Sequence, residues 1–313
     1  MWKRGIVALG GLLFIISVER SAAQQLVGNN LVIVRDLNSL ADSGCPLLRL
    51  RITQSIEYSL ALSGIFFVNW EKDRGGNHLV LLQDLLCQWL AENGRNLRVI
   101  QKFTHHLGLQ YFFDSIARFH IDENTLDTRL EWKFRKNYGL FFSSSLSTRI
   151  FNLYTLEPND SGYQVRSLHS SFLTPFTGIF SAGFQFRWPG FGSLNFGLSS
   201  SRLTWIRDKS VYEAQQTDIW YGVPSVKKGL LEYGISFQFL VDADLVKWFH
   251  WNCDLLIFKN TDLPVDLSLK NLFRFRINRF LKVRLQTRVF YEEQVSKKVQ
   301  FENMISVGFS LTL

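Results

Sequence analysis

The stretch VQFENMISVGFSLTL, Val299 to Leu313, decides the fold that we predict for this chain. Apolar side chains occupy every second position except the one held by Asn303: Val299, Phe301, Ile305, Val307, Phe309, Leu311 and Leu313. Successive side chains of a strand point to opposite faces, so this stretch would have one apolar and one polar face. About ten residues of tilted strand cross a bilayer, and outer-membrane barrels use this alternation. The stretch therefore predicts a membrane-spanning strand of a bacterial outer-membrane β-barrel.

The same stretch resembles the C-terminal signal that the outer-membrane barrel assembly machinery reads. The residues that would form this signal are Ile305, Val307, Phe309, Leu311 and Leu313. The resemblance implies the assembly machinery and periplasmic chaperones as partners during biogenesis. It also implies outer-membrane lipid and lipopolysaccharide as the surroundings of the folded protein.

The N-terminal region has the layout of a secretory signal peptide. Lys3 and Arg4 precede an apolar segment at 5–18, and Ser21-Ala22-Ala23 is a small-residue cleavage site. We expect cleavage after Ala23, hence a signal peptide at 1–23, a periplasmic segment or plug at 24–48 and the barrel at 49–313. Export through the Sec pathway of a Gram-negative bacterium follows from this layout. No window of eighteen apolar residues occurs elsewhere, which argues against a helical membrane protein.

Composition agrees with a chain that is half in lipid and half in water. Aromatic residues reach 15%, with 28 Phe and 9 Trp, while the mean hydropathy is only +0.01. The three cysteines, Cys45, Cys87 and Cys253, are an odd number without metal-binding spacing. A Cys45–Cys87 disulfide stays open as an alternative to isolated thiols.

Period-2 segments recur along the chain and predict an all-β fold, a transmembrane antiparallel up-and-down β-barrel. We count twelve strands, with ten or fourteen as alternatives, at Arg49–Val68, His78–Glu92, Arg98–Phe112, Leu126–Phe134, Ser143–Phe151, Phe180–Trp188, Ser193–Trp205, Leu231–Val241, Phe249–Ile257, Val265–Ile277, Leu281–Tyr291 and Val299–Leu313. His78–Glu92 could also form a helix. Short and long connections should alternate, as in outer-membrane barrels. The long ones are at 70–77, 114–125, 156–177, 207–227 and 292–298, while the connection at 259–262 is unexpectedly brief for its place in this series.

Several short motifs make the chain similar to a family of uncharacterised outer-membrane β-barrels that carries a domain-of-unknown-function label. They are Asn69-Trp70 followed by Gly75-Gly76-Asn77, Phe172-Leu173 with Pro175, Leu203-Thr204, Gly222-Val223, and the strand pair around Asn271 and Asn278. The resemblance spans roughly 49–313. It implies an outer-membrane location and a barrel fold, and no established activity.

The alternation predicts which charged residues face the lumen. The candidates are Arg129, Lys133, Arg187, Lys270, Arg274, Arg276, Lys282, Arg284, Arg288, Glu232, Asp254, Asp266 and Glu302, with Asp127 and Glu131 pointing the same way. Aromatic side chains mostly fall on the opposite face. This separation argues against a nucleic-acid site, where cations and aromatics share a surface.

Two roles fit such a lumen. Acids and bases could pair across a narrow interior and stiffen a structural or interaction protein without catalysis, which is the reading that we favour from sequence. Alternatively, the basic residues could select small, preferably anionic solutes in a channel.

A membrane-embedded hydrolase of the outer-membrane phospholipase kind is a further alternative. His169 lies two positions from both Ser167 and Ser171, but no oriented third residue is evident and serine is abundant. His105 and His106 point to opposite faces and cannot jointly bind a metal. We predict no cofactor, metal site or enzymatic activity.

Overall fold

The computed structural model describes residues 23–27, 30–36, 51–68, 78–93, 96–112, 115–158, 164–261, 265–278, 280–292 and 296–312. All of the predicted signal peptide except Ala23, together with Cys45 and most of the 24–48 segment, lies outside these residues. No helix within the described ranges is long and apolar enough to cross a membrane.

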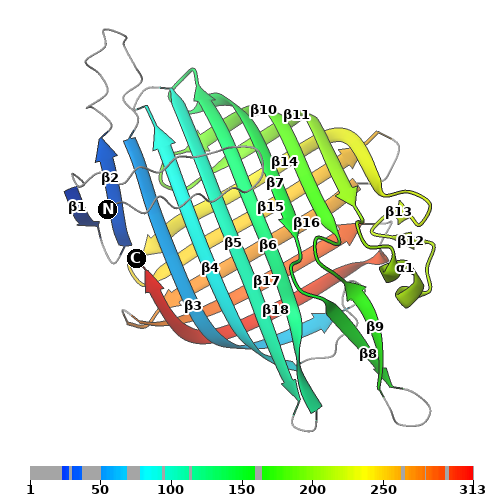
Figure 1. Cartoon of the computed structure of the whole chain (residues 1–313). Coiled ribbons are helices and arrows are strands. Elements are labelled where there is room, and N and C mark those ends of the chain that lie inside the picture. Colours follow the sequence, from blue (N-terminus) through cyan, green and yellow to red (C-terminus); the bar gives the residue numbers. More distant parts are fainter. Residues whose placement is uncertain are drawn as a thin grey trace, which may run out of the picture.

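Twelve antiparallel strands close into one barrel (Figure 1). Around the ring they are β3 (Arg51–Val68), β4 (His78–Glu92), β5 (Leu97–Phe112), β6 (Ser115–Lys133), β7 (Tyr138–Thr148), β10 (Phe176–Trp188), β11 (Gly192–Trp205), β14 (Gly229–Val246), β15 (Phe249–Asn260), β16 (Val265–Arg276), β17 (Leu281–Glu292) and β18 (Ser296–Thr312). The seam pairs β18 with β3, for instance Val307 with Leu62. The predicted twelve-strand barrel is confirmed, and His78–Glu92 is a strand.

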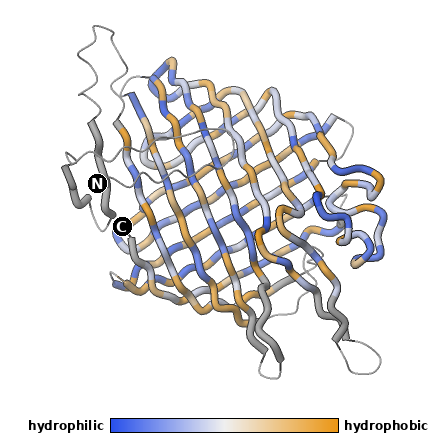
Figure 2. Tube along the Cα trace, in the orientation of Figure 1, coloured by the Kyte–Doolittle hydropathy of each residue, from blue (hydrophilic) through white to orange (hydrophobic). Residues whose placement is uncertain are grey.

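Side chains alternate across the barrel wall as the sequence predicts. On β3 the outward Leu62 is 57% exposed, whereas its neighbour Ser63 faces inward, is fully buried and donates to Ser306 Oγ at 2.7 Å. Figure 2 shows the alternation of hydrophobic and hydrophilic positions along the strands. An apolar exterior and a polar interior without free strand edges suit a barrel that spans a membrane.

Connections at the two ends of the barrel differ in length. One end, which we call the short-turn end, has turns at 93–96, 134–137, 189–191, 247–248 and 277–280. The opposite, long-loop end carries the segments 149–175 and 206–228. The prediction of a loop at 114–125 is wrong, because β6 begins at Ser115 and forms a long hairpin with β5.

The two long segments of the long-loop end pack against each other. The first holds the hairpin of β8 (Leu153–Pro158) and β9 (Gln164–Ser170), and the second holds α1 (Ser210–Gln215), β12 (Ile219–Trp220) and β13 (Val223–Pro224). The apolar core of the second segment contains Ile206, Val211, Tyr212 and Val223, and Leu168 of β9 packs against it. Before α1, the Ser210 hydroxyl donates to Asp208 and lowers the pKa of that carboxyl below its usual value.

A further pair of strands lies beside the seam. β1 (Ala23–Val27) and β2 (Asn30–Asp36) form a hairpin, and β2 pairs with β3 at Arg51 and Ile52, beyond the last residue of β18 that pairs with β3.

Candidate functional site: the barrel interior

One half of the lumen is filled by a network of paired charges. Glu57 on β3 accepts from Lys282 Nζ at 2.7 Å, and its other carboxylate oxygen lies 3.6 Å from Arg274 Nη1. Asp84 on β4 pairs with Arg284 and with His106 Nδ1. Because each carboxylate contacts at least two basic groups, this half of the lumen holds compensated charge rather than an open basic surface.

An apolar plug continues this filling toward the long-loop end. Ile65, Val80, Leu82 and Met304 point inward from three neighbouring strands and are almost completely buried, with Ile121 packed against them. Apolar side chains inside a barrel exclude water from that part of the lumen. The half of the interior lined by β3, β4, β17 and β18 is therefore largely closed.

The other half holds a cavity of about 770 Å³. Its lining extends from Gly190 and Phe191, in a turn at the short-turn end, to Arg149 and Tyr221 at the long-loop end. The cavity thus follows the whole length of the barrel. Arg149 closes part of its long-loop mouth, since its guanidinium donates to the hydroxyls of Ser170 and Tyr221 at 3.2 and 3.3 Å.

Hydroxyl groups line one side of this cavity. Its serines come mainly from β7, β10, β11 and β14: Ser143, Ser144, Ser145, Ser147, Ser181, Ser193 and Ser236. Several are held by one another or by an acid, as when Ser145 Oγ donates to Asp127 at 2.6 Å. These small side chains leave room along the wall, so the cavity extends beside the serine-rich strands.

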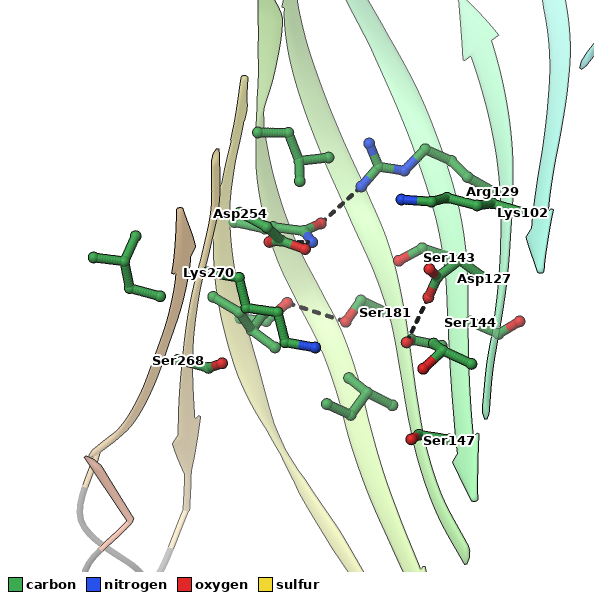
Figure 3. Close-up of a pocket in the computed structure, with 18 of the residues that line it drawn as sticks. Lys102, Asp127, Arg129, Ser143, Ser144, Ser147, Ser181, Asp254, Ser268 and Lys270 are labelled. Atoms are coloured by element: carbon green, nitrogen blue, oxygen red, sulfur yellow. Dashed lines mark hydrogen bonds between the residues drawn. The ribbon is translucent and has the colours of Figure 1, made fainter. Parts of the chain in front are cut away.

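Charged groups of both signs line the remainder. Figure 3 shows Lys102 and Arg129 pointing into the cavity from one side and Asp254 and Lys270 from the other. The lining contains eight bases, Arg98, Lys102, Arg129, Arg149, Arg187, Arg202, Lys270 and Arg288, and nine acids, Asp122, Glu123, Asp127, Glu131, Asp242, Asp254, Asp266, Glu292 and Glu302. Eight against nine gives a formal charge near zero, so the cavity has no strong single-sign field.

Ion pairs cross the lumen near its centre. Glu123 on β6 accepts from Lys270 Nζ on β16 at 3.2 Å and from Arg288 Nη2 on β17 at 3.1 Å. β6 and β16 are diametrically opposite, with five strands between them on either side of the ring. We call this contact the cross-lumen bridge. Its three residues also line the cavity, together with the serines.

A second cluster joins Arg202 to three acids at the long-loop side. Arg202 Nε donates to Glu232 at 2.6 Å, and its Nη1 lies 2.8 Å from Asp266 and 3.4 Å from Glu292. The guanidinium side chain is 14% exposed, so it is largely enclosed by these carboxylates and by Phe258, over whose ring it lies. The group ties β11 and β14 to β16 and β17 through the lumen.

The candidates from the sequence occupy different parts of this interior. Those at the cavity are Arg129, Arg187, Lys270, Arg288, Asp254, Asp266 and Glu302. Glu232 lies beside it, bound to Arg202, while Arg274, Lys282 and Arg284 belong to the filled half. Lys133 and Arg276 are exposed at the short-turn end.

Several lumen-facing residues were not predicted from the sequence, and the reason can be identified for each. Glu123 falls in the segment taken for a loop. Arg202 follows a register shift between Gly197 and Ser200, so simple alternation does not give its orientation. Asp84 lies in the segment with an ambiguous helical pattern.

The histidines considered for hydrolysis and metal binding lie in different parts of the fold. His169 and Ser171 are buried in the long-loop end, and His169 packs edge-on against Trp220 at 5.1 Å. On the lipid-facing side, His105 Nδ1 contacts Asn124 Oδ1 at 2.6 Å, but no serine is hydrogen-bonded to His105 within the described part of the chain. His106 faces the lumen, and no group of three metal-binding side chains occurs among the described residues.

Comparison with known proteins finds matches among solved structures at low sequence identity. No protein-family model and no curated protein matches the chain. The KdgM porin in complex with disordered oligogalacturonate is 9% identical, with a TM-score of 0.34, over 80% of this chain and 98% of that chain. The NanC porin is 6% identical, with a TM-score of 0.38, over 80% and 98%. The translocator domain of the autotransporter NalP from Neisseria meningitidis is 10% identical, with a TM-score of 0.38, over 87% and 92%.

Proposed function

We propose that this chain forms a narrow channel for small polar solutes in the outer membrane of a Gram-negative bacterium. The observation that carries the proposal is the cavity of about 770 Å³, which reaches from the turn at Gly190 to Arg149 and Tyr221 at the opposite end. A closed barrel with an apolar exterior supports the location, because such barrels satisfy every backbone group inside a bilayer. The polar lining supports passage of water-soluble molecules.

The lining favours uncharged or zwitterionic solutes over anions. Eight bases and nine acids line the cavity, and serine hydroxyls form one wall. The strongly basic residues Arg274, Lys282 and Arg284 are held by Glu57 and Asp84 in the filled half. The anionic preference considered from sequence therefore has less support than weak selectivity.

The cross-lumen bridge supports the alternative hypothesis of a structural or interaction protein, because paired charges that join opposite strands stiffen a barrel. The two functions differ in a planar bilayer. We expect purified protein to give discrete, small conductance steps with little preference between potassium and chloride. Folded, heat-modifiable protein that never conducts would overturn the channel proposal and leave the structural role.

A point substitution tests whether current passes through this cavity. Lys102 projects into it (Figure 3), so Lys102→Glu should raise the cation-to-anion permeability ratio by about a factor of two or more. Arg135→Glu makes the same charge change in an exposed turn at 134–137 and serves as the control. If both substitutions change the reversal potential equally, the current does not pass through this cavity.

A further inference from the structure

The outer surface of the barrel carries a polar stripe in its membrane-facing region. Asn271 on β16, Thr287 on β17 and Asn303 on β18 are direct neighbours in the strand register. All three point outward, since the adjacent Lys270, Arg288 and Glu302 point into the lumen. We call these three residues the outer polar stripe.

The outer polar stripe lies near the middle of the membrane-spanning region. Thr287 is six residues from Leu281 and five from Glu292, the ends of β17. At about 3.3 Å per residue and a tilt of about 40°, each end is roughly 13–15 Å away along the barrel axis. The side chains of the stripe therefore face the hydrocarbon, where polar groups without partners are unfavourable.

Hydrogen bonds within the chain satisfy only part of the stripe. Thr287 Oγ1 donates to Asn303 Oδ1 at 2.9 Å, and Trp251 Nε1 donates to Asn271 Oδ1 at 2.7 Å. Both amide oxygens are thus engaged. Among the described residues, neither Asn271 Nδ2 nor Asn303 Nδ2 has a hydrogen-bond acceptor. The barrel therefore presents two amide groups whose N–H donors are directed at lipid.

The outward side chains in two other parts of the barrel exterior differ from those of the outer polar stripe. On β5 and β6, the outward His105 Nδ1 is hydrogen-bonded to Asn124 Oδ1, and Asn124 Nδ2 donates to Asp122 Oδ1. The outward face of β14 and β15 is apolar, with Ile235, Phe237, Phe239, Leu255 and Ile257.

We propose that the outer polar stripe is the contact through which a second copy of this chain binds side by side in the membrane. An amide oxygen has two lone pairs, so each carboxamide oxygen of the stripe can accept a second hydrogen bond and supply the acceptor that an Nδ2 group of the other copy lacks. A two-fold axis along the membrane normal keeps each residue at its own depth and makes the contact self-complementary. Thr287, on the central strand of the three, would lie at the axis. Interactions of this kind join helices in membranes.

Disulfide trapping in native membranes tests the geometry. The full chain is first freed of its own thiols by Cys45→Ala, Cys87→Ala and Cys253→Ala. In this background, Thr287→Cys should give a covalent dimer as the main product of mild oxidation. Ile235→Cys, which faces lipid from β14, is the matched control and should remain largely monomeric. Equal trapping at the two positions, or monomer at both, would overturn the proposal.

Amide removal tests the chemistry independently of cysteine. The double variant Asn271→Leu, Asn303→Leu should lower the dimer-to-monomer ratio in lipid nanodiscs by about tenfold while leaving heat-modifiable folding intact. Gln83→Leu removes an outward amide on β4, outside the stripe, and should leave the ratio unchanged. A monomeric wild-type chain in purified nanodiscs, or a double variant as dimeric as wild type, refutes self-association through the stripe.

Discussion

At the scale of single residues, the interior is governed by how each charge is compensated. Arg202 shows this most clearly, because one guanidinium lies among the carboxylates of Glu232, Asp266 and Glu292. A base surrounded by three acids lowers their mutual repulsion, and its removal leaves like charges enclosed together. The charged residues of the lumen are therefore electrostatically coupled, and substitution of one member of a cluster changes the energy of the remaining charges.

We expect Arg202→Met to destabilise the barrel. The methionine preserves much of the side-chain volume but leaves the three carboxylates without their shared cation. The free energy of unfolding should fall by on the order of 3 kcal/mol, measured by guanidinium titration of the protein refolded in lipid vesicles. Lys133→Met, at the exposed end of β6, removes a base without acidic partners of this kind and should change stability by about 0.5 kcal/mol or less. Similar losses in both variants would argue against the cluster as a stabilising element.

At the scale of elements, the seam between β18 and β3 closes the barrel and depends on a close backbone approach. A Cβ atom added to Gly308 would lie 2.3 Å from the Leu60 carbonyl oxygen and 2.4 Å from Ala61 Cβ. Only glycine fits there without displacing one strand from the other. The same strand carries the predicted assembly residues, of which Ile305, Val307 and Phe309 point outward.

Gly308→Ala should therefore weaken closure of the barrel. We expect a loss of about 1–3 kcal/mol in the free energy of unfolding and a smaller heat-modifiable fraction on gels. Gly64→Ala is the matched control on the partner strand, because a Cβ there meets its nearest atoms at 3.5 Å, an ordinary contact. If Gly308→Ala closes as efficiently as Gly64→Ala, the seam tolerates more separation than the geometry indicates.

At the scale of the whole molecule, the lumen consists of a filled half and an open half. The cross-lumen bridge at Glu123 marks their boundary and joins opposite sides of the ring. Lys270 is half exposed within this bridge, so solvent in the cavity reaches it. In the proposed channel, solutes would therefore pass beside the charges of this bridge.

Glu123→Gln tests this arrangement in the channel. Lys270 and Arg288 would lose their shared counter-ion and would no longer be held across the lumen by Glu123. Single-channel conductance should therefore rise, and permeability should shift toward chloride. Glu131→Gln, on the same inward face of β6, loosens contacts with Arg98, Arg129 and Arg187, none of which spans the lumen. It should shift selectivity without a comparable rise in conductance. A Glu123→Gln channel with the conductance of the unmodified protein would show that the bridge does not limit passage.

Much of the architecture could be predicted from local pattern. Alternation in Leu281–Tyr291 and Val299–Leu313 identifies strands and their lipid-facing sides without knowledge of their partners, because a strand's two faces depend only on parity. Where parity is interrupted, the prediction failed: the register shift near Ser200 hid Arg202, and the polar run around Glu123 was taken for a loop.

The sequence by itself determined the fold class, an even strand number near twelve and which face of most strands meets lipid. Only the tertiary structure decided which inward charges pair and where space remains. Glu123 and Lys270 are 147 residues apart and come together only because closure places β6 opposite β16. Alternation directs a side chain to the lumen, but the partner that it meets depends on ring position and depth, which are fixed by the register of all twelve strands together.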